Sequence, residues 1–180
     1  MALAITSLPR NPSFAQGLGL ALAGAALITL GAKVQIPFWP VPMTLHTLSV
    51  FLVALTLGPR LGLAAMAAYL GAGAAGLPVF SGTPERGIGL SYMVGPTGGY
   101  LLAGLTGWLA MGRGWIGRVL AMLAGLTVVY AGGLAWLALF VPAPKLLAAG
   151  LTPFLLGDVV KVLLVATLLS GLSRLKGRDQ

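Results

Sequence analysis

The sequence contains no cysteine, one histidine and very few acidic residues. Three Asp and Glu residues stand against 11 Lys and Arg residues, and charged residues make up only 8% of the 180-residue chain. Without cysteine, disulfides and Cys-ligated metal centres are excluded, and a single histidine excludes a site built from several imidazoles. We therefore expect neither a metal nor a cofactor. No Gly-Lys dipeptide occurs, so a P-loop is excluded and any ATP-driven work needs another chain.

Charge is also too scarce to cover a water-exposed surface. Soluble domains carry about 25% charged residues, whereas this chain is 58% hydrophobic and has a mean hydropathy of +0.98. The composition therefore predicts an all-α integral membrane protein. The net charge of +8 is spread between apolar runs instead of forming one patch. This pattern argues against a nucleic-acid partner and fits contacts with membrane lipids.

Six apolar runs follow one another along the chain: Phe14–Ala32, Met43–Leu57, Leu61–Leu77, Tyr100–Met111, Val119–Phe140 and Pro153–Gly171. A membrane-spanning helix needs about 20 residues, so the second and fourth runs are short. Their loops nevertheless support six spans, because six spans place seven basic residues on one side and three on the other, as the positive-inside rule expects. The seven are Arg10, Arg60, Arg113, Arg118, Arg174, Lys176 and Arg178, and the three are Lys33, Arg86 and Lys145.

These runs predict one transmembrane domain over residues 1–180, a six-helix bundle with cytoplasmic N- and C-termini. Met1–Ser13 lacks a convincing cleavable signal, so we expect the mature protein to begin at Met1. Two connections are more than simple turns. Val34–Pro42 holds three prolines within six residues, which forbids a regular helix. Pro78–Gly99 is long and glycine-rich, and both connections lie outside in the six-span arrangement.

The last apolar run contains two ionisable residues. Asp158 and Lys161 are three positions apart, so they share one face of the predicted helix. Ionisable groups in a membrane are costly and usually mark a functional site. The alternative is a self-neutralising pair that only stiffens the bundle. We favour the functional interpretation because an apolar pair would stabilise the bundle equally well.

Arg86 lies in the long connection among several glycines. It is either a solvated charge beside Glu85 or part of a loop that covers an outward-facing cavity. If Arg86 faces Lys161 and Asp158, the site carries one net positive charge. Such a site fits a ligand with one carboxylate and hydrogen-bond donors for Asp158, since Arg binds carboxylates in bidentate fashion.

Three further residues complete the candidate ligand site: Thr44, His46 and Tyr92. A lone histidine is more often a packed, hydrogen-bonded residue. Tyr69, Tyr92 and Tyr100 could line a pocket, although the interfacial aromatic belt is the default for each of them.

Small residues recur at Gly17, Ala21 and Ala25, a spacing that lets helices approach closely. This stripe is either internal packing or a docking face for a partner subunit.

Several strings of residues in this sequence together resemble the BioY family, the biotin-binding S components of energy-coupling-factor transporters. The strings that carry the resemblance are Pro40–Leu48, Leu57–Gly62, Gly76–Phe80, Gly95–Leu101 and Gly157–Lys161. They occur in order over most of the chain. One departure is that the family usually has Gln at the position of His46.

The resemblance implies a six-helix membrane bundle in the prokaryotic plasma membrane that captures biotin from the outside. It assigns Asp158, Lys161 and Arg86 to the ligand site and likens the small-residue stripe to a docking motif. The implied partners are a coupling transmembrane subunit and two ATPase subunits, although some members of the family work without the ATPase module. Alternatives are an S component for another vitamin, a stand-alone biotin transporter or, less favoured, a membrane enzyme. An enzyme is disfavoured because one buried carboxylate leaves few groups for acid–base catalysis.

Overall fold

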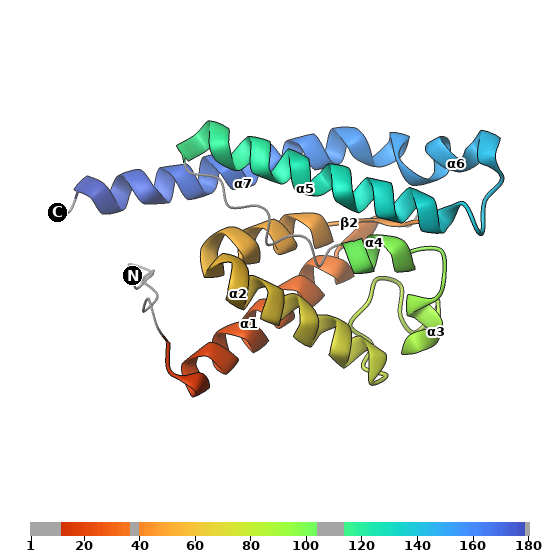
Figure 1. The fold of residues 1–180 in the computed structure, drawn as a ribbon, viewed down its shortest axis with the longest axis horizontal. Helices are drawn as coiled ribbons and strands as arrows, with labels where there is room; N and C mark the ends of the chain where they lie inside the picture. Colours follow the sequence, from red (N-terminus) through yellow and green to blue (C-terminus); the bar gives the residue numbers. More distant parts are fainter. Residues whose placement is uncertain (1–11, 37–39, 104–113, 179–180) are drawn as a thin grey trace.

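The structure of the protein is a computed structural model that describes residues 12–36, 40–103 and 114–178. The described elements are α1 (Phe14–Lys33), β1 (Gln35–Ile36), β2 (Met43–Thr44), α2 (His46–Ala74), α3 (Leu90–Met93), α4 (Gly98–Ala103), α5 (Gly114–Leu137), α6 (Ala143–Gly150) and α7 (Thr152–Arg178). In Figure 1, α5 and α7 lie side by side as one layer, and α1 and α2 cross beneath them.

Helix α1 begins at a capping box. The Ser13 hydroxyl accepts a hydrogen bond from the Gln16 backbone N–H, and the Gln16 side chain accepts one from the Ser13 backbone N–H. One face of α1 packs closely on α2. A Cβ added at Gly24 would lie 2.8 Å from the Ala65 Cβ, so glycine is what allows this approach.

The predicted small-residue stripe lies on this packed face. Ala21 is buried, Ala25 packs against the core shared with α2, and a Cβ added at Gly17 would lie 3.7 Å from Leu61 Cδ2. These contacts favour packing within the bundle, which we held as the alternative, while Gly17 and Ala25 stay partly exposed. A docking role for the stripe stays a prediction.

Helix α2 contains the second and third predicted runs, and it folds back on itself between them. Gly58 has a φ of +79°, a left-handed conformation that favours glycine, and Pro59 begins the second half. A Cβ added at Gly62 would lie 3.2 Å from the Ala54 Cα, whereas residues eight apart in a straight helix are about 12 Å apart. The two runs are therefore two helical segments that pack against each other.

The proline-rich connection is non-helical where the structure describes it, as predicted. It forms a two-stranded antiparallel hairpin in which Gln35 pairs with Thr44 and Ile36 pairs with Met43. Lys33 ties the end of α1 to the long connection, because its Nζ donates to the Phe80 carbonyl at 2.8 Å and to the Thr83 hydroxyl at 2.8 Å.

The remaining predicted runs match the structure to different degrees. The fifth corresponds to α5 and the sixth to α7, which begins at Thr152, one residue before the predicted run. Helix α4 covers only the start of the fourth run, and residues 104–111 lie outside the described residues. The short helix α6, which directly precedes α7, was not predicted. Three buried clusters hold the described elements together: one between α1, α2 and the long connection, one between α2, α5 and α7, and a smaller one between the hairpin, α5 and α7.

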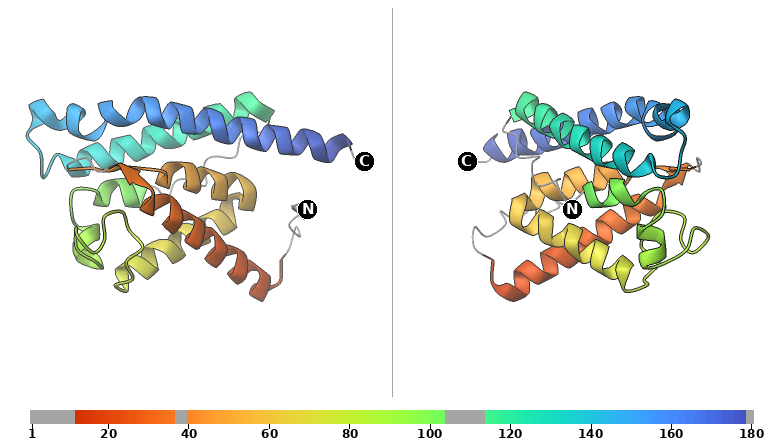
Figure 2. Two further views of the ribbon diagram at one scale, coloured as in Figure 1. Left: turned by 180° about the vertical axis from the view of Figure 1, so that it is seen from behind. Right: turned by 45° about the vertical axis from the view of Figure 1, so that its right-hand side comes forward.

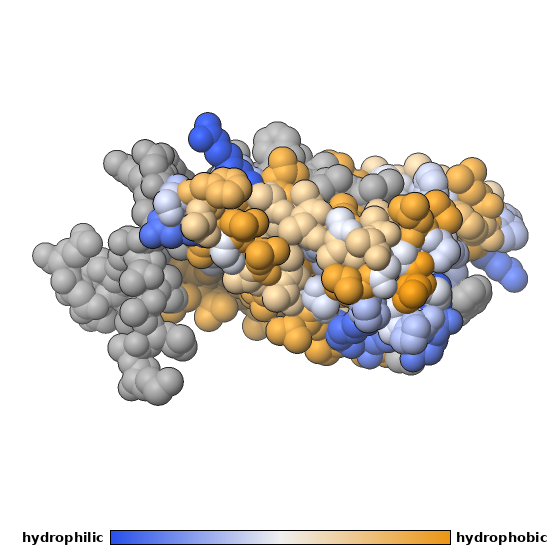
Figure 3. Space-filling model, turned by 90° about the horizontal axis from the view of Figure 1, so that it is seen from below, coloured by the Kyte–Doolittle hydropathy of each residue, from blue (hydrophilic) through white to orange (hydrophobic). Residues whose placement is uncertain are grey.

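Among the described residues, four helical segments are long and apolar enough to cross a membrane: Phe14–Lys33, His46–Ala74, Gly114–Leu137 and Ala143–Ser173. Large apolar side chains point outward from them, among them Leu156, which is 77% exposed. Figure 3 shows apolar residues across the middle of one face and polar residues towards its two ends. This distribution is the reverse of a soluble protein's and fits a lipid-facing surface.

The fold has two distinct ends, which both views in Figure 2 show. We call the first the basic end; the start of α1, the turn within α2, the start of α5 and the last turn of α7 lie there. The opposite, loop end carries the hairpin, the 78–99 connection and α6. Arg60 and Arg118, which we predicted to lie on the same side of the membrane, are both at the basic end. Arg10 and Arg113 lie outside the described residues.

Candidate functional site

Asp158 and Lys161, in the first half of α7, form a buried ion pair near the loop end. Asp158 is 5% exposed and Lys161 is 8% exposed, and Lys161 Nζ lies 2.8 Å from Asp158 Oδ1. Their spacing of three residues brings them onto one face of the helix, as predicted. Charges this deeply buried are stable only when they are paired and hydrogen-bonded.

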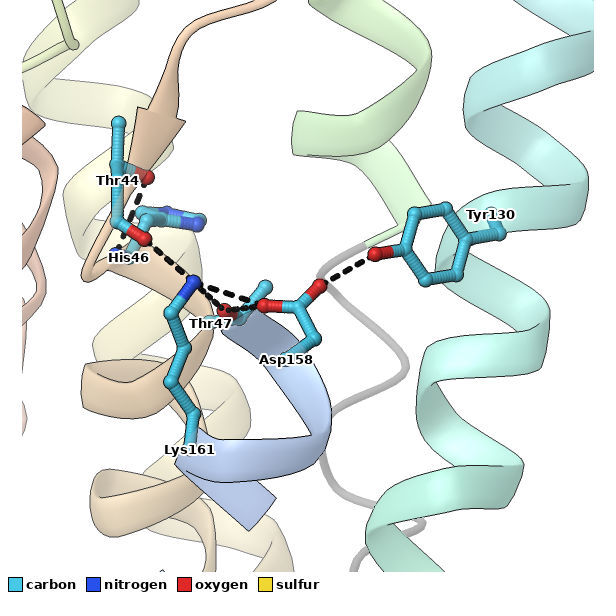
Figure 4. Close-up of polar contacts among 6 residues, drawn as sticks. All are labelled: Thr44, His46, Thr47, Tyr130, Asp158 and Lys161. Carbon is cyan, nitrogen blue, oxygen red and sulfur yellow. Dashed lines mark hydrogen bonds and ion pairs between the residues drawn. The ribbon is translucent and has the colours of Figure 1, made fainter. Parts of the chain in front are cut away.

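Residues from three other elements complete this network (Figure 4). Thr47, in the first turn of α2, donates its hydroxyl proton to Asp158 Oδ1 at 2.9 Å, and Tyr130 on α5 donates to Asp158 Oδ2 at 2.5 Å. Lys161 Nζ also donates to the Thr44 carbonyl at 2.7 Å and to the Thr47 hydroxyl at 3.2 Å. The ammonium therefore has one partner for each of its three protons.

The network forms part of the wall of a cavity in the part of the chain that the structure describes. The wall draws on α1, the hairpin, α2, the 78–99 connection, α4, α5 and α7. Its residues are Ala32, Val41, Pro42, Thr44, His46, Thr47, Tyr69, Ser81, Tyr92, Thr97, Tyr100, Leu101, Val129, Tyr130, Phe154, Asp158 and Lys161.

Five of the six predicted ligand residues lie on this wall, and Arg86 does not. The Arg86 guanidinium donates from Nη1 to the Pro40 carbonyl at 3.0 Å, so it fixes the 78–99 connection to the hairpin. A ligand role for Arg86 stays a prediction.

The three tyrosines for which the aromatic belt was the default interpretation all line the cavity. Tyr69 and Tyr92 are 1% and 4% exposed, and the Tyr100 hydroxyl donates to the Gly150 carbonyl at 2.8 Å. Burial raises the pKa of Tyr92, and hydrogen bonding to Thr97 and the nearby Arg86 charge oppose that rise. The Tyr92 phenol is therefore a neutral group at physiological pH.

Sequence reasoning missed Thr47 and Tyr130 as partners of Asp158. Tyr130 carried a usable signal, because a phenol in the middle of the fifth apolar run is a polar group at membrane depth. Thr47 carried little signal of this kind, because it lies close to Thr44 and His46, which are also polar. Within the described ranges no group of three His, Cys, Asp or Glu side chains could hold a metal ion.

Comparison with known proteins gives concordant matches along nearly the whole chain. The model of the BioY family matches residues 6–178. The probable biotin transporter BioY of Pyrococcus horikoshii is 40% identical over 149 residues, which cover 82% of this chain and 90% of that protein. The biotin transporter BioY of Thermotoga maritima is 37% identical over 158 residues, which cover 84% and 92%.

A solved structure also matches the fold. It is the crystal structure at 2.1 Å of the S-component for biotin from an ECF-type ABC transporter, with a TM-score of 0.76 and 26% sequence identity. The match covers 89% of this chain and 92% of that one.

Proposed function

The chain belongs to the BioY family, and we propose that its cavity binds biotin as the first step of the vitamin's uptake into the cell. The family consists of transporters and not of enzymes, and the apolar helices make this a multi-pass protein of the cell membrane. The observation that carries the proposal is the buried Asp158–Lys161 network on the wall of the cavity. An apolar bundle needs no such pair for stability.

The chemistry of the cavity suits the two ends of biotin. A carboxylate has about four acceptor positions, and only three bonds to Asp158 are described. Asp158 can therefore accept an N–H of the ureido group. Lys161 has all three protons engaged, so its role is to hold Asp158 in place, and the ligand carboxylate is expected nearer Arg86. No cofactor enters this scheme.

The predicted six-helix arrangement is also part of this proposal. The two halves of α2 fold back on each other and count as two crossings, and α4 begins the segment predicted as the fourth. The basic end holds Arg60, Arg118 and the three basic residues in the last turns of α7, against three basic residues at the loop end. This excess is why we assign the basic end, with both termini, to the cytoplasm. The loop end, with the cavity beneath the 78–99 connection, then faces the outside.

The likeness to an S-component suggests that the protein works with a coupling module. We propose a coupling transmembrane subunit and two ATPase subunits as partners, because the chain has no ATP-binding motif of its own. Action as a stand-alone biotin transporter is the second candidate. On α1, a partner or lipid can reach the exposed apolar face, which includes Leu18 and Leu22, and docking at the stripe stays a prediction.

Ligand screening tests the proposal. A ligand that binds only the folded state stabilises it by about 2.7 kcal/mol at 100 times its dissociation constant. Biotin should therefore raise the unfolding temperature of the purified protein in detergent, whereas thiamine, riboflavin and niacin should not. Stabilisation by one of those three in place of biotin would assign the cavity to another vitamin.

A further inference from the structure

Two polar atoms on the cavity wall are buried and have no hydrogen-bond partner among the described residues. They are Nε2 of His46 and the hydroxyl oxygen of Tyr69. Both residues line the cavity, and their ring centroids lie 5.3 Å apart. Buried polar atoms nearly always have a hydrogen-bond partner in folded proteins. Two neighbouring residues on a cavity wall whose buried polar atoms lack one therefore call for an explanation.

Several other hydrogen-bond donors on the wall are already engaged by the protein. Lys161 uses its three protons on Thr44, Thr47 and Asp158. The Tyr130 hydroxyl donates to Asp158, and the Tyr100 hydroxyl donates to a main-chain carbonyl. A ligand oxygen that enters the cavity can therefore bind at Tyr69 and His46 without breaking a bond of the Asp158 network.

Both residues are held firmly in place. The Tyr69 ring packs edge-on against Phe80 at 5.4 Å, and Phe80 stacks on Tyr92 at 4.9 Å. Phe80 itself is fully buried, and it fills space that a Cβ at Gly73 would occupy. His46 is fixed at its backbone, where its N–H donates to the Thr44 hydroxyl at 3.2 Å. Groups that are fixed before the ligand arrives bind it at a lower entropic cost.

The electrostatics of this region decide which kind of oxygen fits. Asp158 and Lys161 cancel each other's charge, and no other charged residue is among those that line the cavity. A buried neutral environment favours an uncharged acceptor over a carboxylate. A carbonyl oxygen has two lone pairs and can accept one bond from the Tyr69 hydroxyl and one from a His46 ring that carries its proton on Nε2.

We propose that Tyr69 and His46 together bind an uncharged carbonyl oxygen of the ligand. This inference rests on the proposed function, and for biotin the group is the carbonyl of the urea ring. One N–H of the same ring would then reach the remaining acceptor position of Asp158. The two residues thus determine specificity for a cyclic urea, which pairs an acceptor oxygen with donors on either side.

The test compares biotin with biotinol, whose tail ends in a hydroxyl and which keeps the urea ring. We expect Tyr69→Phe to weaken the binding of both ligands by about ten-fold, the loss of one hydrogen bond. His46→Leu should have a similar effect, and His46→Gln should bind more tightly than His46→Leu because its amide restores an N–H donor.

A second measurement follows the ligand-free protein. Tyr69→Phe should leave its unfolding temperature unchanged or higher, because the hydroxyl has no partner to lose. Tyr100→Phe is the matched control; it removes a phenol hydroxyl that is already bonded and should lower that temperature.

Three results would overturn the inference: unchanged affinity in Tyr69→Phe, a loss confined to biotin that assigns the residue to the carboxylate, or destabilisation of the ligand-free variant. Failure of the unmodified protein to bind biotin would instead refute the proposed function.

Discussion

The ion pair of α7 allows a quantitative prediction for Asp158→Asn. The substitution keeps the side chain's size and removes its charge, which leaves the Lys161 ammonium buried without a counter-ion. With Nζ and Oδ1 2.8 Å apart, two unit charges attract by ~6 kcal/mol at an effective dielectric constant of ~20. Part of this attraction only offsets the cost of removing both charges from water, and breaking one partner of a buried pair typically costs about 3–5 kcal/mol. We expect Asp158→Asn to lower the free energy of unfolding by that amount.

The matched control removes both charges. In Asp158→Asn combined with Lys161→Met, no charge is left buried and most of the lost stability should return. The assay is unfolding of the four proteins of this cycle in mixed detergent micelles, without ligand. Additive effects of the two substitutions, or an Asp158→Asn variant as stable as the unmodified protein, would refute the reasoning that the two charges depend on each other.

Three other substitutions test the network, the helix packing and the loop attachment. Tyr130→Phe removes one hydrogen bond to a charged carboxylate and should lower the free energy of unfolding by about 1.5–3 kcal/mol, measured in the same micelles. Gly31→Ala places a Cβ 2.1 Å from a side-chain oxygen of α2, and thermal unfolding should show a loss of about 1–3 kcal/mol; Gly19→Ala, with nothing within 4 Å, is the neutral control. Lys33→Met removes the attachment of α1 to the 78–99 connection, so amide hydrogen exchange should become faster there and stay unchanged in α5. Equal exchange in both proteins would show that other contacts hold the connection.

Local sequence spacing predicted the parts of the fold and site that depend on local structure. Apolar runs located α1, α5 and α7, and a spacing of three placed Asp158 beside Lys161. The same reasoning treated Met43–Leu57 and Leu61–Leu77 as separate spans, and the structure shows them as two segments joined at Gly58.

Contacts between distant parts of the chain could not be predicted in this way. Tyr130 meets Asp158 across two helices, and that pairing depends on how α5 and α7 are aligned. Which face of α1 is buried depends on where α2 lies, which is why the small-residue stripe had two interpretations. Arg86 also had two interpretations, because its contact with the Pro40 carbonyl depends on how the 78–99 connection lies against the hairpin.

The central claim is that the cavity binds biotin through the network around Asp158. Equilibrium titration of labelled biotin into the purified protein tests it most directly, with the Asp158→Asn, Lys161→Met double variant beside it. We predict saturable binding of one biotin per chain by the unmodified protein, and loss of that binding in the double variant while it remains folded. Absence of binding by the unmodified protein, or undiminished affinity in the folded double variant, would contradict the account.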